Sequence, residues 1–161
     1  MKAIVVAGDK NYLTPMLTTI KSILYHNQQV KIYILHQNIP SDWFRELKIQ
    51  VEKLGSVVED IYIGDVIDAE WKTQEHISPI AYARYLIPRL ITEDRVIYLD
   101  SDIIVNGDLS PLFELDLGDY SLAAVRDADG NGFNSGMLVI DSQKWREQDI
   151  TSRLFTKTCL L

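Results

Sequence analysis

Short hydrophobic runs alternate with longer amphipathic segments through the first half of the chain. Residues 3–7, 30–35 and 57–63 are rich in β-branched and other apolar side chains, as is typical of strands buried on both faces. Between them, residues 13–27 and 40–54 have helical periodicity, and the apolar stripe of the first is Leu13, Met16, Leu17, Ile20, Ile23 and Leu24. This alternation predicts an α/β fold with a mainly parallel, Rossmann-like sheet flanked by helices.

Prolines and glycines indicate where the helices begin and end. Thr14 before Pro15 predicts an N-cap with proline at the first helical position, and Gly55 is expected to stop the second helix. After a polar loop over residues 64–76, a third helix is expected from Ser78-Pro79 to about Ile87, where Pro88 limits it.

The second half of the chain continues the pattern. Three more apolar runs predict strands at residues 96–99, 121–125 and 137–140, and residues 109–115 read as a short connection. Asp141 or Ser142 is placed to cap a helix that runs through Trp145, and the tail to Leu161 has an amphipathic helical pattern. The whole chain is therefore expected to form a single domain over residues 1–161.

Two acids interrupt the apolar pattern at one point. Asp100 and Asp102 stand directly after the run 96–99, separated by Ser101, and a second apolar run follows at residues 103–105. Ionised carboxylates this close to a core need a cation or a shared proton. Oxygen ligands at a strand end suit Mn²⁺ or Mg²⁺, especially when substrate phosphates complete the coordination shell. The alternative interpretation is a turn with two solvated acids.

Other polar residues should collect at the same edge of the sheet. Ligands of such sheets bind beyond the carboxyl ends of the strands, so Asp9, after the first strand, and Asp100 should share one edge. Arg84 lies in the apolar segment 78–87, where an arginine either extends to solvent or faces an anion. A loop of acids, glycines and an asparagine, residues 126–132, follows the strand 121–125.

Composition narrows the function further. The chain has 161 residues, 47% of them hydrophobic, and a formal net charge of −7 without a basic cluster, which argues against a nucleic-acid-binding surface. Cys159 is the single cysteine, so no intrachain disulfide can form and a reducing compartment fits. The first apolar run breaks at Gly8-Asp9-Lys10, too early for a signal peptide or a membrane span. These features predict a cytoplasmic protein, and the absence of glycine-rich dinucleotide and Walker motifs disfavours dehydrogenases and P-loop NTPases.

With these segments in place, the sequence resembles glycosyltransferase family 8, the retaining sugar-nucleotide transferases of the GT-A fold. Four segments carry the likeness in the order of the family: residues 4–12, 82–85, 96–102, and 133–140 with 144–146. They correspond to a nucleotide-binding start, a helix with an arginine, the Asp-x-Asp strand, and a later Asn-x-Gly strand with its helix. Asp-x-Asp alone is weak evidence, whereas four segments in order span almost the whole chain.

The resemblance implies a role for each matching residue. Asp100 and Asp102 would hold Mn²⁺ or Mg²⁺ on the diphosphate of a UDP-sugar, and Ser101 would lie by the ribose. The uridine and ribose would be held by Ala7, Asp9, Asn11 and Tyr12. Arg84 would meet the donor's phosphate or sugar hydroxyls, and the sugar pocket would be lined by Asp127, Asn134, Ser135 and Gly136. Asp127 and Arg84 are the candidate catalytic residues for transfer of a hexose to a saccharide or glycoprotein acceptor.

The family pattern continues beyond the last residue of this chain. Catalytic domains of family 8 carry a later segment with a histidine as third protein ligand, beside a glycine and a lysine near the diphosphate. None of these follows Leu161. The resemblance therefore implies that the C-terminal part of the domain is missing, and the apolar surface this would expose predicts a homo-oligomer.

Two other functions fit parts of the sequence. A non-catalytic nucleotide-sugar-binding or assembly module could keep the first half of the fold without turnover. A haloacid-dehalogenase-type phosphatase also places Asp-x-Asp after a strand, with the first aspartate as nucleophile. In that class the motif opens the core domain, whereas here a long segment precedes it.

Overall fold

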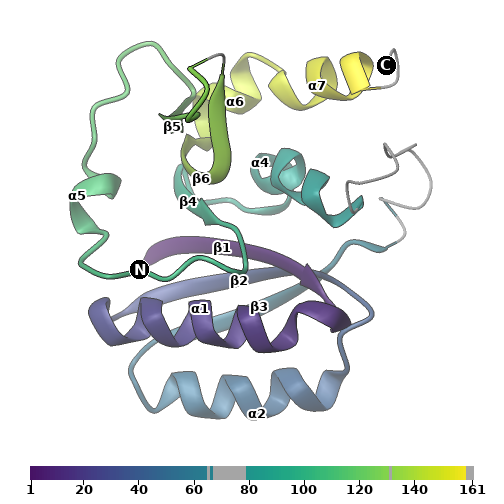
Figure 1. Cartoon of the computed structure of the whole chain (residues 1–161), viewed down its shortest axis with the longest axis vertical. Coiled ribbons are helices and arrows are strands. Elements are labelled where there is room, and N and C mark those ends of the chain that lie inside the picture. Colours follow the sequence, from purple (N-terminus) through teal and green to yellow (C-terminus); the bar gives the residue numbers. More distant parts are fainter. Residues whose placement is uncertain (65, 67–78, 131, 159–161) are drawn as a thin grey trace.

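The computed structural model describes residues 1–64, 66, 79–130 and 132–158. These residues form one six-stranded sheet in the order β3-β2-β1-β4-β6-β5 (Figure 1). The strands in that order are Val57–Tyr62, Val30–Gln37, Lys2–Asp9, Arg95–Leu99, Phe133–Asp141 and Leu122–Arg126. β6 runs in the opposite direction to the other five strands, which are parallel to one another. The prediction of an α/β fold with a mainly parallel sheet is therefore confirmed.

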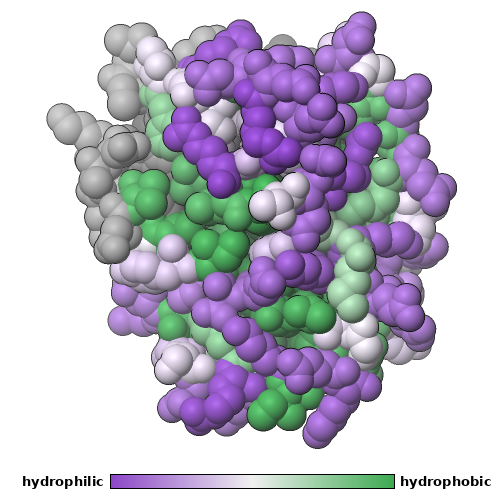
Figure 2. All heavy atoms as spheres, turned by 180° about the vertical axis from the view of Figure 1, so that it is seen from behind, coloured by the Kyte–Doolittle hydropathy of each residue, from purple (hydrophilic) through white to green (hydrophobic). Residues whose placement is uncertain are grey.

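Helices cover both faces of the sheet. Figure 1 shows α1 (Leu13–His26) and α2 (Ser41–Glu52) on one side, and α4 (Ile87–Leu90), α6 (Ser142–Glu147) and α7 (Ile150–Thr158) on the other. Two short helices, η1 (Lys10–Tyr12) and α5 (Ser110–Phe113), lie in the connections, and η2 (Pro79–Leu86) precedes α4. From the opposite side, hydrophilic side chains dominate the surface, and hydrophobic ones gather mainly left of centre (Figure 2).

The central strand β1 is buried on both faces, which is why its sequence is continuously apolar. Ile4 and Val6 belong to the core cluster beneath α1 and α2, whereas Ala3 and Val5 belong to the cluster on the opposite face. Side chains alternate between the two faces of a strand, so one apolar run serves two cores. Each fully buried aliphatic side chain contributes about 1.5–3 kcal/mol to this packing.

Helix α1 begins at Leu13 as predicted, but the predicted N-cap residue is wrong. Thr14 lies inside the helix, the N-cap position is Tyr12, and the capping side chain of this region is that of Asp9, which accepts a hydrogen bond from the Asn11 N–H at the start of η1. Because η1 runs directly into α1, the helical turn begins straight after β1. Pro15 is tolerated because N–H groups in the first turn have no intrahelical acceptor.

The predicted role of Pro88 is also wrong. Residues 79–86 form a 3-10 helix rather than an α-helix, and Pro88 lies in the first turn of α4, which continues from it. Proline suits that position because its fixed φ matches the helix and its missing N–H would have no acceptor there. Ser78, residue 65 and residues 67–76 of the predicted loop lie outside the described residues.

The predictions for the last part of the chain are confirmed. The strand predicted at residues 137–140 extends to Phe133–Asp141, and the Asp141 carboxylate accepts a hydrogen bond from the Lys144 N–H at the start of α6. The tail is helical in α7 as far as Thr158, and residues 159–161 of the predicted tail lie outside the described residues. The extended β6 brings residues 133–136 towards the carboxyl end of β4, because the two strands are antiparallel.

Candidate active site at the carboxyl ends of the parallel strands

The two central parallel strands bring the predicted acidic residues to one edge. β1 pairs with β4 in a register that joins Ala3 to Val96 and Val5 to Tyr98. The chain leaves β4 at Asp100 and leaves β1 at Asp9, so both residues stand at the carboxyl edge of the sheet. The expectation that these aspartates share one edge is thus confirmed.

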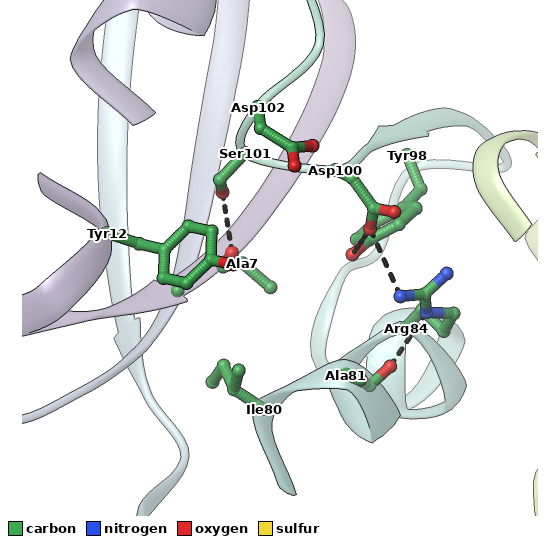
Figure 3. A pocket seen from close by; sticks show the side chains of 10 residues that line it. Ala7, Tyr12, Ile80, Ala81, Arg84, Tyr98, Asp100, Ser101 and Asp102 are labelled. Carbon is green, nitrogen blue, oxygen red and sulfur yellow. Dashed lines mark hydrogen bonds and ion pairs between the residues drawn. The ribbon is translucent and has the colours of Figure 1, made fainter. Parts of the chain in front are cut away.

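A pocket of about 270 Å³ opens at this edge (Figure 3). In Figure 3, Ala7 and Tyr12 lie across the pocket from Ile80 and Ala81 of η2, and the two aspartates lie between the two sides. The residues that line it are Ala7, Gly8, Tyr12, Ile80, Ala81, Arg84, Tyr98, Asp100, Ser101 and Asp102. Six of the residues selected from the sequence therefore meet around one cavity: Ala7, Tyr12, Arg84, Asp100, Ser101 and Asp102.

Asp100 is held by donors from its own strand and from η2. The Tyr98 hydroxyl donates to its Oδ1 at 2.7 Å, and Nη2 of Arg84 donates to the same oxygen at 3.1 Å. The Asp100 N–H donates to the Gly136 carbonyl oxygen at 2.7 Å, which ties the acidic turn to β6. From the described residues Oδ2 accepts no hydrogen bond, so its lone pairs remain for a ligand.

Arg84 is buried, with an exposed fraction of 9%, and most of its hydrogen-bonding capacity is satisfied within the protein. Its Nε donates to the Ala81 carbonyl oxygen at 2.7 Å, and Nη1 donates to both the carbonyl and the hydroxyl oxygen of Ser135. The guanidinium also lies over the Tyr98 ring, 4.8 Å from its centroid. Arg84 therefore faces an anion rather than extending to solvent, and that anion is the carboxylate of Asp100.

Ser101 joins the acidic turn to the first strand. Its side chain is buried, and its hydroxyl donates to the Ala7 carbonyl oxygen at 2.6 Å. Asp102 next to it is exposed, and no described side chain hydrogen-bonds its carboxylate. The Asp-x-Asp segment thus has one anchored acid, one anchored serine and one acid open to ligands.

The start of β6 supports the site from behind. Ser135 contacts Arg84, and the Asn134 side-chain oxygen accepts a hydrogen bond from the Gly136 N–H at 2.8 Å. A Cβ at Gly136 would stand 2.7 Å from Oδ2 of Asp100, so only glycine lets β6 pass this close to the carboxylate. These three residues lie beside the pocket rather than in its lining.

Three other predicted site residues lie further from the cavity wall. The Asp9 carboxylate accepts the Asn11 N–H, and neither residue is part of the lining. Asp127 is exposed at the turn after β5, where its carboxylate accepts the Ala128 N–H. Because β5 runs parallel to β4, this turn lies at the same edge of the sheet as the acids.

The sequence pattern did not single out Tyr98, Gly8, Ile80 or Ala81. A signal for Tyr98 was present, because residues two apart on a strand point to the same face and Tyr98 stands two before Asp100. Burial raises the pKa of the Tyr98 phenol well above its ordinary value, although the Arg84 guanidinium acts in the opposite direction. The hydroxyl therefore stays protonated and donates to the carboxylate.

The donor set suits a hard divalent cation that is shared with a phosphate ligand. Within the described ranges, no group of three or more histidine, cysteine or acidic side chains is arranged to hold a metal ion alone. Asp102 and Oδ2 of Asp100 instead offer two carboxylate ligands at a pocket with room for more oxygens. Mg²⁺ and Mn²⁺ are often held by one or two carboxylates plus substrate phosphates, so the residues fit such an ion.

The sheet order and the acid-lined pocket fit a GT-A-type glycosyltransferase fold, which is also the fold of the solved glycosyltransferase structures to which the chain is similar. The family model "Glycosyl transferase family 8" matches residues 3–158. The chain therefore belongs to glycosyltransferase family 8. This family membership favours transfer chemistry over the phosphatase alternative.

Related proteins agree with this assignment. The chain is 50% identical to glycosyltransferase GlyD of Streptococcus pneumoniae serotype 4 over 158 residues, which are 98% of this chain and 19% of GlyD. The crystal structure of glycosyltransferase GlyE from S. pneumoniae TIGR4 superposes with a TM-score of 0.83 at 42% identity, over 97% of this chain and 38% of that one. The galactosyltransferase LgtC, solved with donor and acceptor sugar analogues, gives 0.78 at 25% identity, over 97% of this chain and 66% of LgtC.

The chain matches less than half the length of the two S. pneumoniae glycosyltransferases GlyD and GlyE. This chain spans 19% of GlyD and 40% of GlyE.

No helix in the described part of the chain combines the length and the apolar character needed to cross a membrane.

Proposed function

We propose that the chain binds a UDP-hexose in the pocket at the ends of β1 and β4 and transfers the hexose, with retention, to a saccharide or glycoprotein acceptor. The observation that carries this proposal is the meeting of Asp100 and Asp102 with Tyr12 and Arg84 around one cavity. The likeness to LgtC, whose structure holds donor and acceptor sugar analogues, supports the same chemistry.

The nucleotide would occupy the β1 side of the pocket. Tyr12 is half exposed at the rim, where its ring can stack on the uracil base. Ala7 lines the same pocket, and Asp9 and Asn11, at the junction of β1 and η1, would bond the base or ribose. Because the Ser101 hydroxyl is engaged with Ala7, its contribution is to hold the acidic turn against β1.

The diphosphate would lie against the acids. A Mn²⁺ or Mg²⁺ ion held by Asp100 and Asp102, when bound, supplies the positive charge that stabilises the leaving UDP. Within the described residues, Arg84 has one Nη2 hydrogen left after its four protein contacts, so it can also donate to a phosphate or sugar oxygen. Because its protein contacts fix the Arg84 side chain, the remaining N–H would need little reorientation to meet the UDP-sugar.

The sugar would extend towards the start of β6. Asn134, Ser135 and Gly136 approach Asp100 from that side, and the turn that carries Asp127 is at the same edge. In this arrangement Asp127 would orient the hexose or the incoming acceptor hydroxyl. Cytoplasmic localisation, self-association and a single domain over residues 1–161 that lacks its C-terminal part stay predictions of the sequence.

The test is a donor screen. UDP-glucose, UDP-galactose and their N-acetyl forms are each incubated with the chain, Mn²⁺ and a panel of saccharide and glycopeptide acceptors, and both UDP release and the anomeric configuration of the product are measured. Transfer with retention supports the proposal. Metal-dependent binding without transfer or UDP release would instead identify a non-catalytic nucleotide-sugar-binding module.

A further inference from the structure

Tyr98 is a polar residue in an otherwise apolar part of the core. Its side chain is 2% exposed and packs in the cluster that contains Ala83, Ile87 and Leu138. A phenylalanine would fill this space equally well, so packing alone does not account for the hydroxyl. Buried tyrosine hydroxyls usually have a specific partner, and here the partner is Oδ1 of Asp100 at 2.7 Å. That length is typical of a well-formed O–H···O hydrogen bond.

The two oxygens of the Asp100 carboxylate have different environments. Oδ1 accepts from both Tyr98 and Arg84, at 2.7 and 3.1 Å. Oδ2 lies beside Gly136, which has no side chain to cover it, and accepts nothing from the described residues. The carboxylate is therefore fixed in one orientation, with one oxygen committed to the protein and the other available.

The Tyr98 and Arg84 donors cannot replace each other. Arg84 is also bound to Ala81 and Ser135, so its position is set by η2 and β6. Tyr98 is on the same strand that leads into Asp100, and its ring is held by the core. Tyr98 thus ties the Asp100 carboxylate to the buried part of β4, whereas Arg84 ties it to η2 and the start of β6.

We propose that Tyr98 is a positioning residue, whose hydroxyl holds Oδ1 of Asp100 so that Oδ2 is presented to a divalent cation on the nucleotide diphosphate. The inference rests on the proposed function, because it assumes that Asp100 is a ligand of that cation. Hydrogen-bond partners of metal ligands typically change metal affinity by about 10–100-fold when they are removed.

The test removes one hydroxyl and leaves the ring. Tyr98→Phe keeps the apolar packing and the ring under Arg84. Tyr33→Phe is the matched control, because Tyr33 is also a buried sheet tyrosine whose hydroxyl donates to a carboxylate, that of Glu93, away from the pocket. UDP is titrated into each variant by calorimetry, with Mn²⁺ and with EDTA, and circular dichroism checks the fold.

We expect Tyr98→Phe to bind UDP about 10-fold or more weakly in Mn²⁺ but unchanged in EDTA, with Tyr33→Phe equal to wild type in both. Equal affinities of Tyr98→Phe and wild type in Mn²⁺ would overturn the inference. A wild-type chain that binds UDP no better with Mn²⁺ than with EDTA would instead remove the proposed metal role, and the inference with it.

A double-mutant cycle separates positioning from a general effect on the core. In an Asp100→Asn background, Tyr98→Phe should cause no further loss of Mn²⁺-dependent UDP affinity, because the group that it positions is already altered. If Tyr98→Phe lowers the Mn²⁺-dependent UDP affinity equally in the wild-type and Asp100→Asn backgrounds, Tyr98 acts through packing and the inference is contradicted. This comparison holds even if Tyr98→Phe lowers stability.

Discussion

Nη2 of Arg84 and Oδ1 of Asp100 are 3.1 Å apart, so a buried arginine of η2 forms an ion pair with the acid that ends β4. The same guanidinium reaches β6 through Ser135. One side chain thereby fixes three segments that are distant in sequence, and these segments form one side of the pocket. The pocket wall is therefore held together by contacts within the protein.

Replacing Arg84 by lysine should weaken both the fold and the site. Lysine keeps the charge but cannot reach Ala81, Ser135 and Asp100 together, because it lacks the planar fork. Hydrogen bonds to charged groups contribute about 1.5–3 kcal/mol each, and Asp100 is partly solvated, so Arg84→Lys should lower the free energy of unfolding by about 2 kcal/mol. Urea denaturation measures this change.

Arg89→Lys is the control for that experiment. Arg89 lies on α4, is exposed, and donates to the hydroxyl of Ser152. Exposed substitutions of this kind usually change stability by less than about 0.5 kcal/mol. Equal stability losses in the two variants would contradict the special role assigned to Arg84.

Gly136→Ala should disturb the acid rather than the fold. The added Cβ would stand 2.7 Å from Oδ2 of Asp100 and 3.0 Å from the Asn134 side-chain oxygen, so the carboxylate must move. We expect weaker Mn²⁺-dependent UDP binding with a nearly unchanged melting temperature. Gly107→Ala is the matched control, since a Cβ there meets nothing within 4 Å and its φ is not in the left-handed region. Binding by Gly136→Ala equal to that of Gly107→Ala would refute this prediction.

The features of the fold that could be predicted from the sequence are those that leave a local signal in it. Strand and helix positions were predictable because apolar periodicity reflects burial directly, and the position of Asp100 at a strand end followed from the apolar run before it. The 3-10 conformation of η2 was not predictable, because apolar residues three and four apart fit either helix type. The partner of Arg84 was also hidden, since the sequence shows an arginine among apolar residues but not which carboxylate the fold brings to it. Tyr98 was counted as an apolar strand residue because only the fold shows what its hydroxyl meets.

His36, near the carboxyl end of β2, should make the stability of the protein depend on pH. His36 is buried against the rings of Phe44 and Tyr62, and among the described residues neither of its ring nitrogens has a hydrogen-bond partner. Burial lowers the pKa of His36 below its ordinary value of 6.5, although Asp60, 3.9 Å away, opposes this shift. Asp60 in turn is paired with Lys48.

The direction of this pH dependence follows from proton binding to the folded and unfolded chains. Between the lowered folded-state pKa of His36 and 6.5, the unfolded chain binds a proton that the folded chain does not, so the free energy of unfolding should fall as the pH drops below 6.5. A single proton limits the slope to about 1.4 kcal/mol per pH unit. Denaturation curves between pH 8 and 5 should show this slope in wild type and lose it in His36→Phe, whereas His26→Phe should keep it. A slope that persists in His36→Phe would assign it to another group.

The central claim is that Asp100 and Asp102 bind the nucleotide through a divalent cation, and UDP calorimetry tests it most directly. UDP is titrated into wild type and Asp102→Asn, each with Mn²⁺ and with EDTA. The substitution removes an anionic ligand while keeping the shape of an exposed side chain, so the fold should be unaffected. We predict that Mn²⁺ tightens UDP binding to wild type and that Asp102→Asn abolishes this gain while its affinity in EDTA stays the same. Equal UDP affinity of wild type with and without Mn²⁺, or a full Mn²⁺ effect in Asp102→Asn, would contradict the account.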